Sequence, residues 1–91
     1  MLVAICYDVV DDNRRSRLAR YLDGVADRVQ RSVFEGHLDD RTLARVARRT
    51  EQIIDPTCDS VRIYRLCETC AKQTLVIGQG GVTPRPEVVV L

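Results

Sequence analysis

The chain opens with Leu-Val-Ala-Ile-Cys-Tyr-Asp-Val-Val at residues 2–10, a nearly continuous run of apolar and β-branched side chains. A run of this kind predicts a strand that is buried on both faces. Asp8 is its only charged member, and a carboxylate in or at the end of a buried strand needs a cation or hydrogen-bond donors. The stretch therefore predicts a buried strand and makes Asp8 the most informative polar side chain.

Two later segments predict helices. The first covers about residues 11–23; it begins with the capping side chains Asp-Asp-Asn and stops before a glycine. The second covers about residues 39–54, where aspartates can again cap the first turn and Asp-Pro follows the last. Proline disfavours helical geometry in the residue before it, so the second helix is expected to end there.

The remaining segments predict strands. Residues 26–38 lack helical periodicity, and we expect extended structure with a reversal or a bulge inside, the turn falling at about residues 30–32. Residues 61–66 alternate strictly between apolar and polar side chains, which is typical of a half-buried strand. A short apolar run at residues 74–77 predicts one more strand, and residues 87–91 form an apolar terminus that would be costly to expose.

Up to residue 66 the predicted order is β-α-β-β-α-β, which is the ferredoxin-like arrangement. We therefore expect an α+β fold with an antiparallel sheet, two helices on one face and an additional C-terminal strand. The 91 residues suit a single domain, placed at residues 1–78, followed by a tail at residues 79–91. A core this small has little stability in reserve, and dimerisation is a common remedy.

The composition is 45% hydrophobic and 30% charged, which is typical of a globular protein rather than a disordered one. No apolar run approaches the roughly 20 residues that cross a bilayer, and no signal peptide is recognised, so a cytoplasmic protein without membrane contact is expected. The net charge of +1 does not by itself indicate a nucleic-acid binder. Thirteen of the fourteen basic residues are arginine, which either favours phosphate binding or reflects a genome rich in G and C.

Arginines gather near Asp8 in the sequence. They are either a phosphate-binding set close to that acid or a solvated helix face balanced by neighbouring aspartates. Asp8 itself either caps the first helix or pairs with an arginine, or it contributes to a magnesium site that a two-fold dimer completes. The arginines in question are Arg14, Arg15, Arg17, Arg28 and Arg31.

The four cysteines are expected to be reduced. Cys67-Glu-Thr-Cys70 has the spacing of half a zinc site, but the chain has no second such pair. A turn between two strands that carries small apolar side chains is the favoured interpretation of the pair. His37, the single histidine, is interpreted as a residue at the edge of a strand.

Three segments taken together resemble the CRISPR-associated protein two family: Cys6–Arg15, Arg28–Gly36 and Asp59–Tyr64. Their order, their spacing and the short chain match the family over residues 1 to about 78. The most specific part is Val-Gln-x-Ser-Val-Phe-Glu, which spans residues 29–35.

This resemblance implies a ferredoxin-like homodimer in which Asp8 faces its symmetry mate and binds Mg²⁺ or Mn²⁺. It also implies a complex with the CRISPR integrase, CRISPR-associated protein one, that integrates new spacers. The implied nuclease activity is cleavage of single-stranded RNA or double-stranded DNA. In the tail, residues 87–91 could add a strand to the partner subunit. Metal-dependent endoribonuclease and non-catalytic DNA-binding scaffold are the two functions to separate. Positions implicated in nuclease activity match Tyr7, Asp8, Arg15, Arg17, Arg31 and Phe34, while Arg14 and Arg28 compete with neighbouring arginines for the same roles. Asp8 and Tyr7 are accordingly expected to be catalytic. Nucleic-acid binding is expected of Arg14, Arg15, Arg17, Arg28, Arg31 and Phe34.

Overall fold

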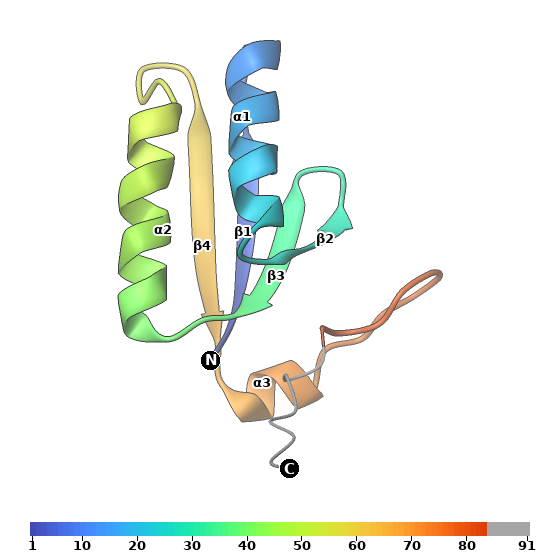
Figure 1. Ribbon diagram of the computed structural model, residues 1–91. Coiled ribbons are helices and arrows are strands. Elements are labelled where there is room, and N and C mark those ends of the chain that lie inside the picture. The colour runs from blue at the N-terminus through green and yellow to red at the C-terminus, as the bar shows by residue number, and fades with distance from the viewer. Residues whose placement is uncertain (84–91) are drawn as a thin grey trace.

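The computed structural model describes residues 1–83, and it confirms the predicted β-α-β-β-α-β order (Figure 1). One short helix follows the last strand. The elements are β1 (Leu2–Asp8), α1 (Asp12–Asp23), β2 (Asp27–Gln30), β3 (Val33–His37), α2 (Asp40–Ile53), β4 (Ser60–Leu66) and α3 (Glu68–Lys72).

The sheet has the strand order β2-β3-β1-β4, and each neighbouring pair is antiparallel. β1 is an inner strand, in which Ile5 lies opposite Phe34 of β3 and Ile63 of β4. The apolar run at the start of the chain supplies side chains to both faces of this strand. The expected antiparallel α+β sheet is therefore confirmed.

Both long helices cover the same face of the sheet (Figure 1). Capping fixes where they begin, because the Asp11 carboxylate accepts the backbone N–H of Arg14 and the Asp39 carboxylate accepts that of Thr42. Within residues 1–83, no helix is long and apolar enough to cross a lipid bilayer. The core between the helices and the sheet includes Val3, Ile5, Tyr7, Val9, Leu18, Leu22, Phe34, Leu43, Val46 and Ile53.

The other face of the sheet is not covered by α1 or α2. Alternation along β1 directs Ala4, Cys6 and Asp8 to this face, because successive side chains of a strand point to opposite sides. At one end α3 lies against it, and Leu2 is buried there in a cavity lined also by Leu66. We call this surface the open sheet face; Asp8 lies at the end that α3 leaves free.

The strand predicted at residues 74–77 is wrong. The chain forms α3 after β4 and then runs as irregular structure, in which Leu75 is 83% exposed and Ile77 is 92% exposed. A strand needs an edge that takes up its backbone hydrogen bonds, and within residues 1–83 these residues pair with no strand. The cysteine pair lies on α3 rather than in a turn between two strands. The terminal strand expected at residues 87–91 lies outside the described residues.

Candidate nucleic-acid interface

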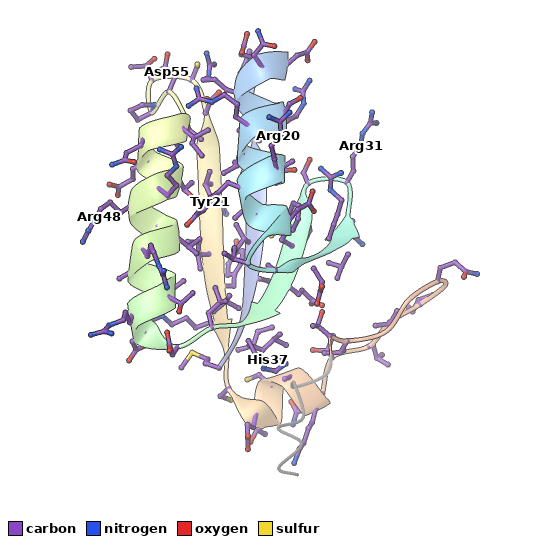
Figure 2. The ribbon with its side chains drawn as sticks, viewed as in Figure 1. Arg20, Tyr21, Arg31, His37, Arg48 and Asp55 are labelled. Atoms are coloured by element: carbon purple, nitrogen blue, oxygen red, sulfur yellow. The ribbon has the colours of Figure 1, made fainter. Side chains whose placement is uncertain are left out.

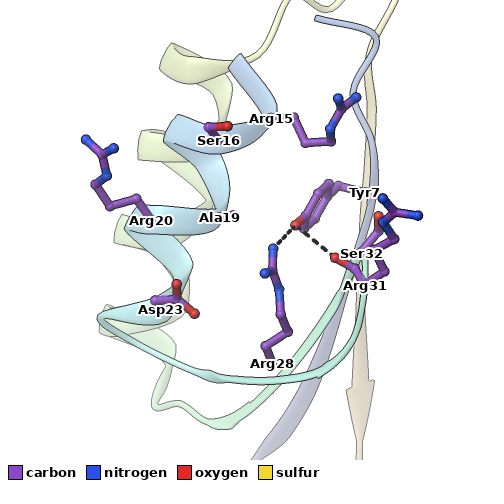
Figure 3. Close-up of a pocket in the computed structure, with 9 residues that line it drawn as sticks. All are labelled: Tyr7, Arg15, Ser16, Ala19, Arg20, Asp23, Arg28, Arg31 and Ser32. Atoms are coloured by element: carbon purple, nitrogen blue, oxygen red, sulfur yellow. Dashed lines mark hydrogen bonds between the residues drawn. The ribbon is translucent and has the colours of Figure 1, made fainter. Parts of the chain in front are cut away.

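A groove of about 410 Å³ lies between α1 and the β2–β3 hairpin (Figure 3). We call it the basic groove, because its lining holds four arginines and a single carboxylate. This excess of fixed positive charge on a concave surface suits a phosphate backbone. The lining residues are Tyr7, Arg15, Ser16, Ala19, Arg20, Asp23, Arg28, Arg31 and Ser32.

Arg28 is held in place at the floor of the groove. One of its guanidinium nitrogens donates a hydrogen bond of 3.2 Å to the Tyr7 hydroxyl, and the guanidinium carbon lies 5.3 Å from the centre of the Phe34 ring (Figure 3). The hydrogen bond to Tyr7 raises the pKa of Arg28 above its ordinary value. The Tyr7 hydroxyl in turn donates to the Arg31 carbonyl at 3.4 Å. Because Arg28 is pre-positioned, it loses little side-chain freedom when a phosphate binds.

Phe34 is completely buried, so the prediction that it contacts nucleic acid is corrected. Its ring stacks against that of Tyr7, with 6.2 Å between the centroids, and belongs to the core between sheet and helices. A buried ring cannot stack on a base; its role is to support Arg28 and Tyr7. Tyr7 is also largely buried, and only its hydroxyl region faces the groove.

A second depression of about 340 Å³ adjoins the basic groove and contains Asp8. Arg15, Arg31 and Ser32 line both. One Arg15 nitrogen donates to the Val9 carbonyl at 2.8 Å, and another pairs with Asp12, which fixes the guanidinium between the two depressions. The groove therefore leads directly to the strand-end carboxylate.

The Asp8 carboxylate is exposed, and among the described residues it accepts no hydrogen bond and forms no ion pair. Within residues 1–83 Asp8 neither caps α1, which Asp11 does, nor pairs with an arginine. No group of three His, Cys, Asp or Glu side chains that could hold a metal is found in residues 1–83. The described residues of one chain thus supply only part of a Mg²⁺ site, namely the carboxylate of Asp8. Mg²⁺ in proteins uses one or two carboxylates and keeps several waters.

Arg14 does not line the basic groove and is paired with Asp59. Its Nε atom lies 2.8 Å from a carboxylate oxygen of Asp59, whose side chain has no exposed surface. The same carboxylate accepts the backbone N–H groups of Val10 and Asp55, each at 2.9 Å. These contacts join the loop after β1 to the loop before β4. Arg14 therefore has a structural role in this connection.

Asp59 and Arg20 were not predicted from the sequence. Nothing local distinguishes Asp59 from an ordinary turn aspartate, because two of its partners, Val10 and Arg14, are distant in the chain. Arg20 was detectable: residues 16, 19, 20 and 23 line the groove and have the spacing of one helix face. Arg17 is exposed on α1 but does not line the groove. Figure 2 shows the positions of two arginines that do line it, Arg20 and Arg31. Arg15, Arg28 and Arg31 are the predicted arginines that the fold brings together.

Comparison with known proteins decides the family. The sequence profile of the family described as CRISPR associated protein Cas2 matches residues 1–74. The chain belongs to the Cas2 family. A Chloroflexus aurantiacus relative named CRISPR-associated endoribonuclease Cas2 3 is 43% identical over 86 residues, which cover 94% of this chain and 92% of the relative. A Thermus thermophilus relative named CRISPR-associated endonuclease Cas2 2 is 42% identical over 90 residues, covering 99% of this chain and 96% of the relative.

Solved structures give the same family. A chain of a partial Cas6-RT-Cas1–Cas2 complex superposes with a TM-score of 0.78 at 30% identity, over 99% of this chain and 98% of that one. The resemblance to this family is therefore confirmed for both sequence and fold.

Removal of the Asp59 carboxylate is expected to destabilise the fold. Asp59→Asn should lower the melting temperature by roughly 5–10 °C, because Arg14 loses its charged partner and buried N–H groups lose an acceptor. The hydrogen bond from Arg14 holds the pKa of Asp59 well below its ordinary 3.8. When the pH falls below 3.8, Asp59 takes up a proton in the unfolded chain before it does so in the folded chain. The stability that the Asp59 carboxylate contributes is therefore present at neutral pH and is lost on acidification.

Urea unfolding between pH 3 and pH 7 measures this effect. The difference in stability between wild type and Asp59→Asn should shrink as the pH falls. Asp27→Asn, at an exposed position on β2, is the matched control and should follow the wild type. Parallel curves for the wild type and Asp59→Asn would contradict the assignment.

Proposed function

We propose that this chain acts as a homodimer in CRISPR spacer integration, that it holds nucleic acid by its phosphates in the basic groove, and that Asp8 supports Mg²⁺-dependent endoribonuclease activity. The observation that carries the proposal is the groove of arginines that leads to an unpaired carboxylate. Family membership supports it, as do a relative named as an endoribonuclease and a structural relative that lies in a complex with Cas1. Cas1, the CRISPR integrase, is accordingly the proposed protein partner.

Three arginines are the proposed phosphate contacts. Arg28 rises from the floor of the groove, while Arg15 and Arg31 stand where the groove meets the Asp8 depression. A guanidinium grips phosphate oxygens bidentately, and such contacts fix the position of the strand without reading its sequence. A backbone that follows the groove would bring one phosphodiester close to Asp8.

A second copy of this chain is the proposed occupant of the open sheet face. This face carries Ala4, Cys6 and the 48% exposed Tyr64, together with Asp8. A two-fold contact buries the same surface on both copies, so the side chains nearest the axis meet their own symmetry mates. If Asp8 lies near the axis, the dimer has two carboxylates at one place, which removes the shortage of metal ligands in a single chain.

The proposed chemistry divides between the metal and the side chains. When bound, Mg²⁺ activates a water and offsets charge that develops on the phosphodiester. Asp8 would hold the ion, and Arg15 and Arg31 would orient the phosphate beside it. For Tyr7 we propose that it positions Arg28 and does not take part in the chemistry, because its hydroxyl is hydrogen-bonded to Arg28 and to the Arg31 carbonyl.

A DNA-binding scaffold without catalysis is the second candidate function. One specific observation favours it: the groove holds four arginines, whereas residues 1–83 hold no three-ligand metal group. In this alternative the arginines hold duplex DNA while the integrase performs the chemistry. Both functions require phosphate binding and differ in what Asp8 must do.

Phosphate binding is tested by salt-dependent affinity. Affinity for a short duplex and for single-stranded RNA is measured between about 50 and 200 mM salt. Arg28→Ala and Arg31→Ala are each expected to lower the log–log salt slope by about one unit, whatever the base sequence. Arg48→Ala is the control: it removes the same charge from the outer side of α2, away from the groove (Figure 2). If Arg48→Ala has an equal effect, binding follows overall charge and the groove assignment is wrong.

A further inference from the structure

The cysteine pair on α3 has an organised geometry that the proposed function does not use. Cys67 is the N-cap of α3, and its sulfur accepts the backbone N–H of Cys70 at 3.4 Å. Both side chains are exposed, so small molecules can reach them. The two other cysteines lie elsewhere, Cys6 in β1 and Cys58 in the loop before β4.

The two thiols of the pair have different acidities. Hydrogen bonds from the backbone N–H and then from the thiol of Cys70 stabilise the Cys67 thiolate and lower its pKa. Donation to Cys67 raises the pKa of Cys70. Cys58 provides the contrast, because desolvation and the nearby carboxylates of Asp55 and Asp59 raise its pKa. Since the thiolate is the nucleophile, Cys67 is the thiol prepared to react, and Cys70 lies beside it to react second.

The geometry points to a function for the pair: we propose that Cys67 and Cys70 form a reversible dithiol–disulfide site that exchanges with low-molecular-weight disulfides. Both cysteines lie in the first turn of α3, where the Cys70 backbone N–H donates to the Cys67 sulfur at 3.4 Å, so the two sulfurs belong to one helical turn. A bond of about 2 Å between them therefore requires a small approach of the side chains rather than a change of fold.

The exchange balances as two successive substitutions. The Cys67 thiolate attacks one sulfur of the small disulfide, whose sulfur–sulfur bond breaks and releases one thiolate that takes up a proton. Cys70, as it loses its proton, attacks the Cys67 sulfur and displaces the second small thiol. The protein loses two hydrogens and two electrons, and the small disulfide gains them as two thiols. An excess of small thiol reverses both steps.

Oxidation of the cysteine pair would change the connection between β4 and residues 73–83, because the pair lies on α3 between them. α3 connects β4 to residues 73–83 (Figure 1). The Thr74 hydroxyl donates to the Cys70 carbonyl at 3.3 Å, so the start of this segment depends on the turn that contains the pair. Its far end returns to β3, where Thr83 bonds to Glu35 and accepts from His37. A disulfide fixes the first of these two anchors.

The test uses the full chain in glutathione buffers of graded potential, with the remaining thiols labelled by a maleimide and counted by intact mass. The reduced protein has four free cysteines, and we expect loss of both the Cys67 and Cys70 labels together at one potential. Hydrogen exchange should slow at residues 70–74 in the oxidised form. Cys70→Ser should instead accumulate a mixed disulfide at Cys67 and show no slowing.

Matched substitutions and a metal assay make the result decisive. Cys6→Ser and Cys58→Ser should leave the paired loss unchanged, because neither residue lies on α3. Labels that persist at oxidising potentials, or oxidation that requires Cys58, would overturn the proposal. Zinc retained by the purified protein and lost in Cys67→Ser would overturn it in favour of metal ligation. None of these readouts depends on nucleic-acid binding, so failure here is distinguishable from failure of the proposed function.

Discussion

Phe34→Ala is expected to lower the free energy of unfolding by about 3–5 kcal/mol, the usual cost of emptying a buried aromatic site. Phe34 is completely buried, and its ring contacts both Tyr7 and Arg28, so neighbours on two sides lose packing. The free energy of unfolding of a small domain is only about 5–15 kcal/mol, so the variant is expected to lose a large fraction of it. Urea unfolding of wild type and variant measures the difference directly.

Phe34→Leu is the matched control, because leucine keeps much of the buried volume but offers no ring. We expect a much smaller loss of stability, together with weaker phosphate binding, since Arg28 loses the aromatic face that holds it. An alanine variant that unfolds at the wild-type urea concentration would show that the ring is not a core element. A leucine variant with unchanged nucleic-acid affinity would show that Phe34 does not position Arg28.

The order of the elements was predictable because local signals define it. The apolar run at residues 2–10, the caps at Asp11 and Asp39 and the strict alternation at residues 61–66 each specify an element without reference to distant residues. Residues 74–77 show the limit of such signals. A short apolar run has the same composition whether or not a strand edge is available to pair with it, and α3 turns the chain away after β4.

The candidate site was predictable in part for a related reason. Of the five arginines predicted as a group, the fold brings Arg15, Arg28 and Arg31 together in the groove, and Arg15 and Arg31 also lie beside Asp8. The role of Phe34 was wrong because it depends on packing in the core. The pairing of Arg14 with Asp59 was not predictable, because it joins residues that are distant in the chain. A sequence pattern shows that a side chain is charged or aromatic, but packing determines whether it faces solvent.

Asp8→Asn is expected to reduce metal-dependent cleavage by at least about 100-fold, because it removes the charge that a hard cation requires while keeping the size of the side chain. Cleavage of single-stranded RNA and duplex DNA is measured over a Mg²⁺ and Mn²⁺ titration, with chelator as the blank. Asp27→Asn, at an exposed carboxylate on β2, is the control and should keep full activity. Full activity in Asp8→Asn, or in excess chelator, would place the cleavage elsewhere.

The same variant separates the enzyme from the scaffold. Asp8→Asn should bind nucleic acid as well as the wild type or slightly better, since it removes a negative charge close to the phosphates that Arg15 and Arg31 are proposed to hold. If the chain is a scaffold, this variant still supports spacer integration when the integrase is supplied. Integration that fails while the dimer and its affinity survive would assign Asp8 to the chemistry, because the unpaired carboxylate is then needed for more than holding the strand.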